Sequence, residues 1–158
     1  MMRKCANCGG KRFQGFDEAH TVEVAGRRFA GKARAWRCLS CGEVYVEGAG
    51  LARVELEAAR ELADAGIVSG ETFRFMRHAL GMTARDVGAE LVVAHETISR
   101  WENEERPLDR LAWATLAAMV REELGENPGR TREQLRVMRK PKRLAKTVRL
   151  ESTRTAAR

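Results

Sequence analysis

The sequence has no long hydrophobic run. None of its segments approaches the roughly 18 consecutive apolar residues that a membrane-spanning helix needs, and the N-terminal residues, Met1 to Cys5, include no apolar stretch that resembles a signal peptide. Hydrophobic residues make up 44% of the 158 residues and charged residues 32%, which is ordinary for a soluble globular protein. We therefore expect a cytoplasmic protein with no membrane partner.

The sequence also lacks the residue patterns that carry out catalysis. It contains no paired catalytic carboxylates, no Ser–His–Asp arrangement and no glycine-rich phosphate loop. Two of the histidines, His20 and His78, lie in no ligand-like context. We therefore predict that the protein is not an enzyme and that it has no catalytic residues.

Cysteine is scarce, and its placement is informative. The four cysteines form two knuckles, each a C-x-x-C followed directly by glycine, at residues 5–9 and 38–42. Two residues between the thiolates let one tight turn aim both sulfurs at a single tetrahedral ion, and the glycine can take the positive φ that closes the turn. Because four thiolates leave no open coordination position for a substrate, we predict one structural Zn²⁺ bound by Cys5, Cys8, Cys38 and Cys41.

Other uses of four cysteines fit this pattern less well. Two disulfides would imply a secreted protein. A thioredoxin-like redox motif would need only one C-x-x-C, in a βαβ setting that is not evident in the sequence. An iron–sulfur cluster also uses four cysteines, but the symmetry of the two knuckles favours zinc.

The patterning along the chain indicates an α+β protein of four segments. They are a four-cysteine zinc ribbon, or small β module, at 1–48, a linker helix within 49–68, an all-α domain at 69–124 and a basic C-terminal extension at 125–158. The ribbon has too few large apolar residues for a core, so we expect the metal to substitute for one. We expect Trp36 and Phe13 to pack on the knuckles and short strands, with a turn at Ala25-Gly26, at 21–24, 28–30, 33–38 and 43–46.

Segment 69–124 carries helix start and stop signals. Ser69 begins one helix, and the capping box at 83–86 begins a short second helix. A third helix covers 95–102, and we expect Asn103 to end it in the left-handed conformation. A longer apolar helix follows at 108–124, and we expect its large side chains to form dimer contacts: Trp113, Leu116, Met119 and Val120.

Two short helices joined by a three-residue turn are the geometry of a helix-turn-helix motif. Val87 and Leu91 on the first helix would face Ile98 and Trp101 on the second, with Val93 filling the turn. Polar residues near the start of the second helix would then face base edges and phosphates in the major groove of DNA. We predict that DNA is contacted by Thr83, Arg85, His95, Glu96, Thr97, Ser99, Arg100 and Arg106.

The sequence Thr-Ile-Ser-Arg-Trp-Glu, at 97–102, closely resembles the recognition helix of Xre-type (lambda repressor-like) regulators, whose pattern continues over about 73–119. With the two-knuckle ribbon before it, the stretch 3–124 resembles the MqsA-type antitoxin family, a YgiT-type zinc ribbon joined to an Xre helix-turn-helix. The resemblance implies a homodimer that binds a palindromic operator in double-stranded DNA and represses its own operon. In antitoxin members of the family, the ribbon also binds a ribonuclease toxin.

Some positions depart from the family pattern. Arg100 matches the family's base-reading arginine. Glu96, however, replaces an asparagine that contacts adenine, and Ala84 replaces a glutamine that contacts phosphate in many Xre proteins. Val92 replaces the glycine of the turn. The residues alone also allow Arg100 to be a surface ion-pair partner of Glu96, four residues earlier, and His95 to be only a solvated helix start.

These observations predict a sequence-specific transcriptional regulator that represses its own operon. The alternative is an antitoxin of a type II toxin–antitoxin system, which would neutralise a ribonuclease toxin through the ribbon and the strands at 21–37. The basic extension, and the lack of an obviously exposed apolar strand, favour the stand-alone regulator. A neighbouring gene for a small basic ribonuclease would favour the antitoxin.

The basic charge is concentrated in the C-terminal extension. Residues 125–158 carry eleven Lys and Arg against three Glu, a net charge of +8, whereas segment 71–124 has seven basic and ten acidic residues. We expect a short helix from the capping box at 131–134 and little other order in the extension. Since phosphate neutralisation dominates non-specific DNA affinity, we expect the cations of the extension to contribute to DNA binding by the slightly acidic helical segment.

Deleting residues 126–158 should therefore flatten the salt dependence of DNA binding, because fewer counterions are released per complex. The measurement is the slope of log Kobs against log salt concentration from fluorescence anisotropy titrations. An unchanged slope would contradict the predicted role of the extension.

Overall fold

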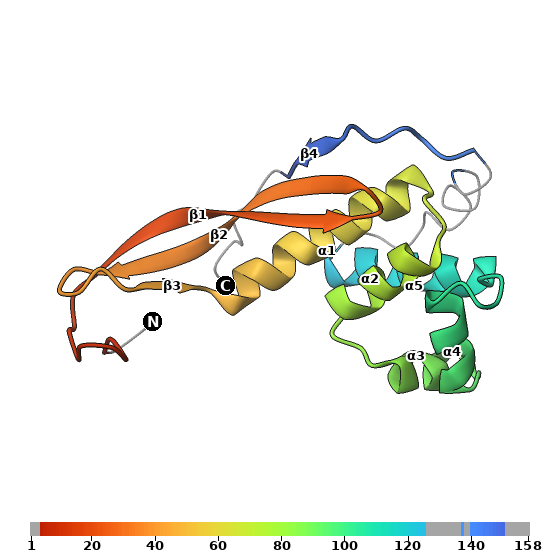
Figure 1. Ribbon diagram of the computed structural model, residues 1–158, viewed down its shortest axis with the longest axis horizontal. Helices are drawn as coiled ribbons and strands as arrows, with labels where there is room; N and C mark the ends of the chain where they lie inside the picture. Colours follow the sequence, from red (N-terminus) through yellow and green to blue (C-terminus); the bar gives the residue numbers. More distant parts are fainter. Residues whose placement is uncertain (1–3, 126–136, 138–139, 151–158) are drawn as a thin grey trace.

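The computed structural model describes residues 4–125, 137 and 140–150. Strands β1 (Phe13–Val24) and β2 (Arg27–Cys38) form a long antiparallel hairpin, and two short strands, β3 (Val44–Val46) and β4 (Thr147–Arg149), pair with the other edge of β2 (Figure 1). The helices of the described residues are α1 (Gly48–Ala65), α2 (Gly70–Ala79), α3 (Ala84–Leu91), α4 (His95–Glu102) and α5 (Arg110–Glu123). The protein is therefore mixed α and β, with a small sheet and a group of helices.

The hairpin turns at the predicted dipeptide. Ala25 and Gly26 both have positive φ, 51° and 65°, as a two-residue type I′ turn requires, and Val24 lies opposite Arg27. The prediction of separate short strands at 21–24, 28–30 and 33–38 is wrong, because each arm of the hairpin is one continuous strand of 12 residues.

Small residues in β2 hide this continuity in the sequence, and the packing of α1 explains why they are there. A Cβ atom on Gly31 would lie 2.9 Å from a methyl group of Val54. One on Gly50 would lie 3.3 Å from the Cβ of Ala33. Residues that suggest a break in a strand are thus the ones that let helix α1 approach the sheet closely.

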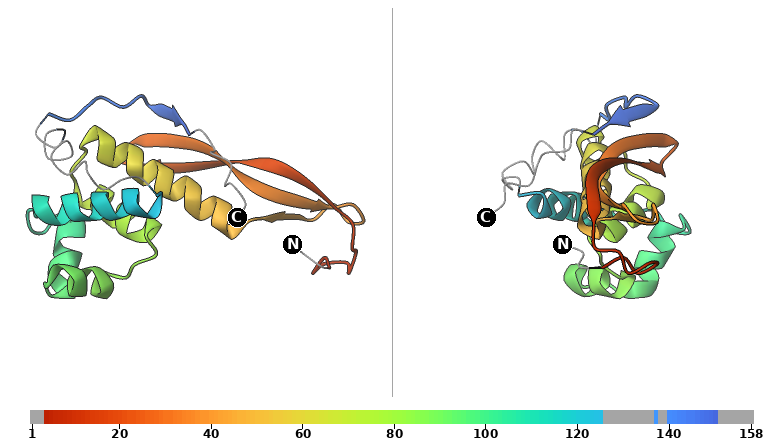
Figure 2. Two further views of the ribbon diagram at one scale, coloured as in Figure 1. Left: turned by 180° about the vertical axis from the view of Figure 1, so that it is seen from behind. Right: turned by 90° about the vertical axis from the view of Figure 1, so that its left-hand side faces the viewer.

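The turn end of the hairpin has an apolar core of its own. Val24 and Phe29 of the sheet are buried against Ala58 and Leu62 of α1, and Val148 of β4 packs on the same cluster. The expectation that the metal substitutes for a core is therefore wrong for this half of the hairpin. Figure 2 shows α1 running along the hairpin from the end near β3 toward the turn.

Part of the C-terminal extension is ordered against this region. The amide of Lys142 donates to the carbonyl of Ala65 at 2.8 Å, and the amide of Leu150 donates to Ala30 at 2.7 Å. Strand β4 runs parallel to β2, so the expectation of little order beyond a short helix is wrong for these residues. The helix predicted from the capping box at 131–134 lies outside the described residues.

The second core lies among the helices. Ala59 and Ala63 of α1 pack in one cluster with buried residues from all four later helices. These residues are Phe73, Met76, Val87, Ile98, Trp101, Trp113, Leu116 and Val120. The indole of Trp113 donates to the hydroxyl of Thr72 at 3.1 Å. Because Trp113, Leu116 and Val120 are at most 1% exposed, the expectation that they form dimer contacts is wrong: the chain's own core already buries them.

Helix termini follow the predicted signals closely. Ser69 and Thr83 each form a capping box, and Gly66 ends α1 in the left-handed conformation. The prediction for Asn103 is wrong: its φ is −91°, and the left-handed residue is Glu104, with a φ of 59°. The last helix begins at Arg110 rather than 108, since the carboxylate of Asp109 caps it by accepting hydrogen bonds from residues 111 and 112.

A buried ion pair joins the C-terminal ends of α2 and α4. The guanidinium of Arg77 donates two hydrogen bonds to the carboxylate of Glu102, at 2.6 and 2.9 Å, and a third to the carbonyl of Met82. The side chains of Arg77 and Glu102 are 9% and 5% exposed. This pair fixes the end of α4 against α2, and its cost of desolvation is offset only while both partners are present.

The substitution Glu102→Leu should therefore destabilise the protein by about 3 kcal/mol or more, because it leaves the buried guanidinium of Arg77 unpaired. The double variant Arg77→Met/Glu102→Leu should recover much of this loss. Urea unfolding followed by tryptophan fluorescence gives the free energy of unfolding.

The matched control is Glu23→Ala, which breaks an ion pair between Arg28 and Glu23, whose side chains are 59% and 67% exposed. It should cost less than about 1 kcal/mol. Equal losses for Glu23→Ala and Glu102→Leu would contradict the assigned role of the buried pair.

Candidate functional site

The two knuckles bring all four cysteines together, as predicted. Their sulfur atoms all lie within 4.8 Å of one another, with 3.6 Å between Cys5 and Cys41 and 3.6 Å between Cys8 and Cys38. Cys5 and Cys38 are buried, whereas Cys8 and Cys41 are exposed. The cluster can hold a metal ion, and the described residues contain no other group of three or more His, Cys, Asp or Glu side chains placed to do so.

Both knuckles have the same backbone geometry. Gly9 and Gly42 have φ values of 71° and 79°, and their amides donate to the carbonyls of Cys5 and Cys38, each at 2.9 Å. Gly10 has a separate role that the sequence pattern does not reveal. A Cβ atom there would lie 3.2 Å from the sulfurs of both Cys8 and Cys38, so only glycine leaves room for the two knuckles to meet.

A tyrosine supports the cluster, and sequence reasoning missed it. The hydroxyl of Tyr45 lies 3.2 Å from the sulfur of Cys5 and accepts a hydrogen bond from the amide of Ala6 at 2.9 Å. The ring of Phe13 packs edge-on against Tyr45, with 6.1 Å between centroids. Trp36, which we expected to pack on the knuckles, lines an open cleft beside Phe13 and Leu39. The only signal in the sequence for the role of Tyr45 was that this single tyrosine lies four residues after the last cysteine.

The surroundings move the thiol pKa values in opposite directions. The hydrogen bond from Tyr45 lowers the pKa of Cys5 to about 6. At Cys8 the backbone amide of Gly10 acts to lower the pKa, but hydrogen bonds with the other cysteines and burial outweigh it and raise the pKa to about 12. A bound dication needs thiolates, so protons compete with the metal for these sulfurs.

Four sulfurs in this arrangement fit a closed, four-coordinate metal site. Thiolate sulfur is a soft donor that suits zinc, copper(I) and iron–sulfur clusters. The backbone amide of Gly10 points at the sulfur of Cys8 from 3.4 Å, and the amide group of Asn7 lies 3.8 Å from the sulfur of Cys41. Such donors stabilise thiolates around a metal.

At the other end of the molecule, helices α3 and α4 pack together across the turn at residues 92–94 (Figure 1). Val87 and Ile98 are fully buried between them, and Trp101 packs edge-on against Phe73 of α2. Gly88 is also required, because a Cβ atom there would lie 2.7 Å from the carbonyl oxygen of Val93. Sequence reasoning did not single out this glycine.

Val92, which ends α3, adopts the left-handed conformation that glycine favours. Its φ and ψ are 55° and 45°, and its side chain is 91% exposed. A β-branched residue in the left-handed region is strained, at a cost of about 1–2 kcal/mol. The turn geometry is therefore imposed by the packing of α3 on α4 rather than by the conformational preference of Val92.

Seven of the eight predicted DNA contacts are exposed, and Thr97 is half-buried. Thr83 is committed to its capping box, where its hydroxyl donates to Asp86 at 2.6 Å. The imidazole of His95 lies 3.3 Å from the carboxylate of Glu96.

The guanidinium of Arg100 forms no hydrogen bond or ion pair with any residue the structure describes, so the alternative of a Glu96–Arg100 ion pair is not formed. Arg106 lies beyond α4, beside a shallow cleft that Arg110 also lines.

Comparisons with known proteins gave no match: no family model, curated protein or solved structure is significantly similar to this chain. In the part of the chain that the structure describes, no helix is both long enough and apolar enough to cross a membrane.

In protein loaded with a metal ion at the cysteine cluster, a chelator should loosen only one end of the hairpin. Hydrogen exchange should become faster for amides near the knuckles, such as those of Cys38 and Phe13, because the cysteine cluster orders that end. Amides near Phe29 and in α1 should stay protected, because an apolar core holds them. The measurement is hydrogen-exchange mass spectrometry with and without chelator, and uniform loss of protection along β2 would contradict this division.

Proposed function

We propose that the protein is a DNA-binding transcriptional regulator of the helix-turn-helix type, with α4 as its recognition helix. The observation that carries the proposal is the pairing of α3 and α4 across a three-residue turn, with a polar, exposed surface at the start of α4. The apolar side of α4 is held by Ile98 and Trp101 in the helical core. Its outward side is thus left free for a partner.

Arg100 is the strongest candidate for base recognition. Its exposed guanidinium has no intramolecular partner among the described residues, and arginine pairs with guanine through two hydrogen bonds in the major groove. Glu96 lies one turn earlier, where its carboxylate could accept a hydrogen bond from the N4 amino group of cytosine. His95 faces Glu96, so the two would act together at the start of the helix.

The metal in this proposal is one structural Zn²⁺ bound by Cys5, Cys8, Cys38 and Cys41. All four sulfurs converge, and the cluster keeps no position for substrate, which favours a structural role. The family resemblance adds the expectation of a homodimer on a palindromic operator, with recognition helices about 34 Å apart. A dimer would also double the number of phosphate contacts, which the acidic helical segment needs.

The antitoxin is a second candidate, and one observation favours it. Strand β1 forms the open edge of the sheet, because its other side pairs with β2 and no described strand covers the free edge. An open edge of 12 residues can accept a strand from another protein. A partner that adds a strand to β1 would leave α4 accessible, so toxin binding and DNA binding are compatible.

The substitution Arg100→Ala should weaken binding to a selected duplex by about 10- to 100-fold, because a bidentate arginine–guanine contact contributes roughly 1–3 kcal/mol of discrimination. Duplex sites are first selected by the wild-type protein from a random DNA library, and affinities are then measured by fluorescence anisotropy. Affinity for an unrelated duplex should change much less.

The matched control is Arg28→Ala, at an exposed residue near the hairpin turn that is far from α4 along the chain and pairs with Glu23. It should leave the selected sites and their affinities unchanged. Failure of the wild-type protein to enrich any duplex, or equal effects of the two substitutions, would contradict the proposed role of α4.

A further inference from the structure

The end of the sheet near the knuckles carries an open cleft that the proposed function does not use. It has a volume of about 570 Å³ and is called here the ribbon cleft; its lining residues are Lys11, Arg12, Phe13, Gly15, Arg34, Trp36 and Leu39. None of these residues is acidic. Leu39 is 53% exposed, and Trp36 is half-buried.

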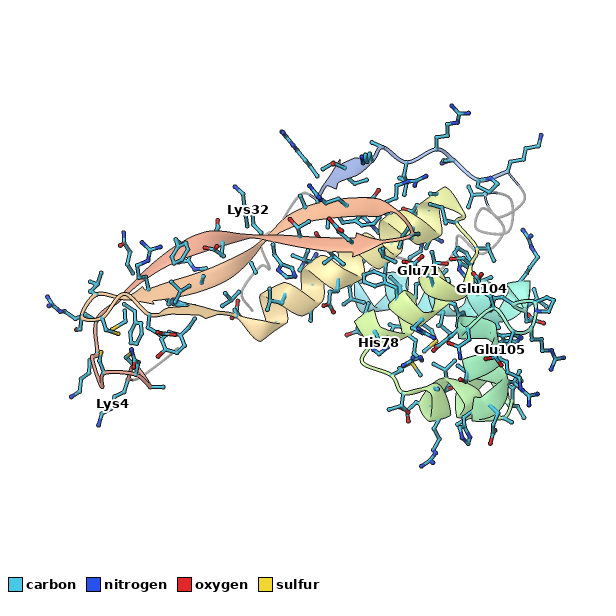
Figure 3. The ribbon with its side chains drawn as sticks, viewed as in Figure 1. Lys4, Lys32, Glu71, His78, Glu104 and Glu105 are labelled. Carbon is cyan, nitrogen blue, oxygen red and sulfur yellow. The ribbon has the colours of Figure 1, made fainter. Side chains whose placement is uncertain are left out.

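Strand register explains why these side chains share one face. Trp36 lies opposite Gly15 and Arg34 lies opposite Asp17, and cross-strand partners project to the same side of a sheet. The intervening residues of β2, Ala33 and Ala35, are buried on the side that α1 covers. The ribbon cleft therefore faces away from α1, on the same side as Lys32, which Figure 3 shows projecting from the hairpin away from the helix.

Gly15 makes room in the cleft for the guanidinium of Arg34. A Cβ atom at this position would lie 2.5 Å from a terminal nitrogen of Arg34, so the guanidinium lies across the glycine, in the same cleft as Trp36. Any larger residue would displace it. The strand thus leaves an arginine plane and an indole side by side.

The charge of the ribbon cleft is poorly neutralised. Among the described residues, Arg34 pairs only with Asp17, at 3.5 Å, and the two side chains are 50% and 60% exposed, so water screens this pair. The side chains of Lys11 and Arg12 form no hydrogen bond or ion pair with any described residue. Three cations therefore face solvent around an aromatic surface.

We propose that the ribbon cleft binds single-stranded nucleic acid. Lys11, Arg12 and Arg34 would contact the phosphodiester backbone, and an unpaired base would stack on Trp36. Cations interleaved with an aromatic ring are how proteins hold single strands, because every base has a π-face and every nucleotide a charge. An acidic protein segment would use the cations but not the indole.

This site is separate from the one proposed for duplex DNA. The knuckle end of the hairpin and helices α3 and α4 lie at opposite ends of the long axis of the molecule (Figure 1). The inference does not rest on the proposed function, and either can fail without the other.

Trp36 provides a direct readout. The protein has three tryptophans, and Trp101 and Trp113 are 6% and 0% exposed, so a base that stacks on the surface should quench mainly Trp36. The experiment titrates the zinc-loaded full chain with oligo(dT) and oligo(rU) of about 15 nucleotides, within the range of site sizes of single-strand binders, and follows tryptophan fluorescence and the anisotropy of a labelled strand. The same titration in increasing salt counts the phosphate contacts.

Two variants separate stacking from charge. Trp36→Leu should weaken binding about 10-fold while keeping the salt slope, and Lys11→Gln/Arg12→Gln should weaken binding and flatten that slope. The control Arg28→Ala, at an exposed residue near the hairpin turn that does not line the ribbon cleft, should bind the single strands like wild type. Unchanged metal content and far-ultraviolet circular dichroism confirm that each variant is folded.

Quenching of tryptophan fluorescence by the oligonucleotides would support the proposal if it is lost in Trp36→Leu. Tighter binding of oligo(dT) or of oligo(rU) would then identify DNA or RNA as the source of the strand. The proposal is wrong if wild-type protein shows no quenching, or if Trp36→Leu binds as tightly as wild type. It is also wrong if polyglutamate of equal charge displaces the strands as effectively as unlabelled oligonucleotide, since that result would indicate an acidic protein as the partner.

Discussion

The structure depends on helix α1, which is packed on two sides at once. Ala58 and Leu62 face the turn end of the hairpin, whereas Ala59 and Ala63 face the helical core. On the sheet side, Gly31 and Ala33 of β2 meet Val54 and Gly50 of α1, so the sheet approaches α1 closely and has little room to shift. The ion pair between Arg121 and Asp64 adds a polar contact between α5 and α1. The knuckles and α4 are therefore held at opposite ends of one continuous packed unit.

The two ends are stabilised by different means. At the helical end, α4 is fixed by buried apolar side chains and by the Arg77–Glu102 pair, which together can support a strained residue at Val92. At the knuckle end, apolar burial is sparse and the four cysteines provide the order. Metal loading should therefore affect the ribbon cleft much more than it affects α4.

Local signals in the sequence predicted the helices and the cysteine cluster well. Capping boxes at Ser69 and Thr83, the glycine after α1 and the spacing of the cysteines all act within a few residues, so they can be read without the fold. Features that depend on distant partners were missed. Tyr45 reaches Cys5 across 40 positions, the Arg77–Glu102 pair spans 25, and the small residues of β2 make sense only against α1. The expectation that Trp113, Leu116 and Val120 of α5 form dimer contacts was wrong for the same reason, because these side chains are already buried within the chain.

Helix α4 is the surface that we propose reads duplex DNA. The most direct test is hydrogen-exchange mass spectrometry of the full, zinc-loaded protein, with and without a duplex that it selects. If α4 reads the duplex, amides at the start of α4 and in the turn before it should become protected, with little change along α1 and β2. Protection confined to the hairpin, with α4 exchanging as in the free protein, would contradict this role of α4.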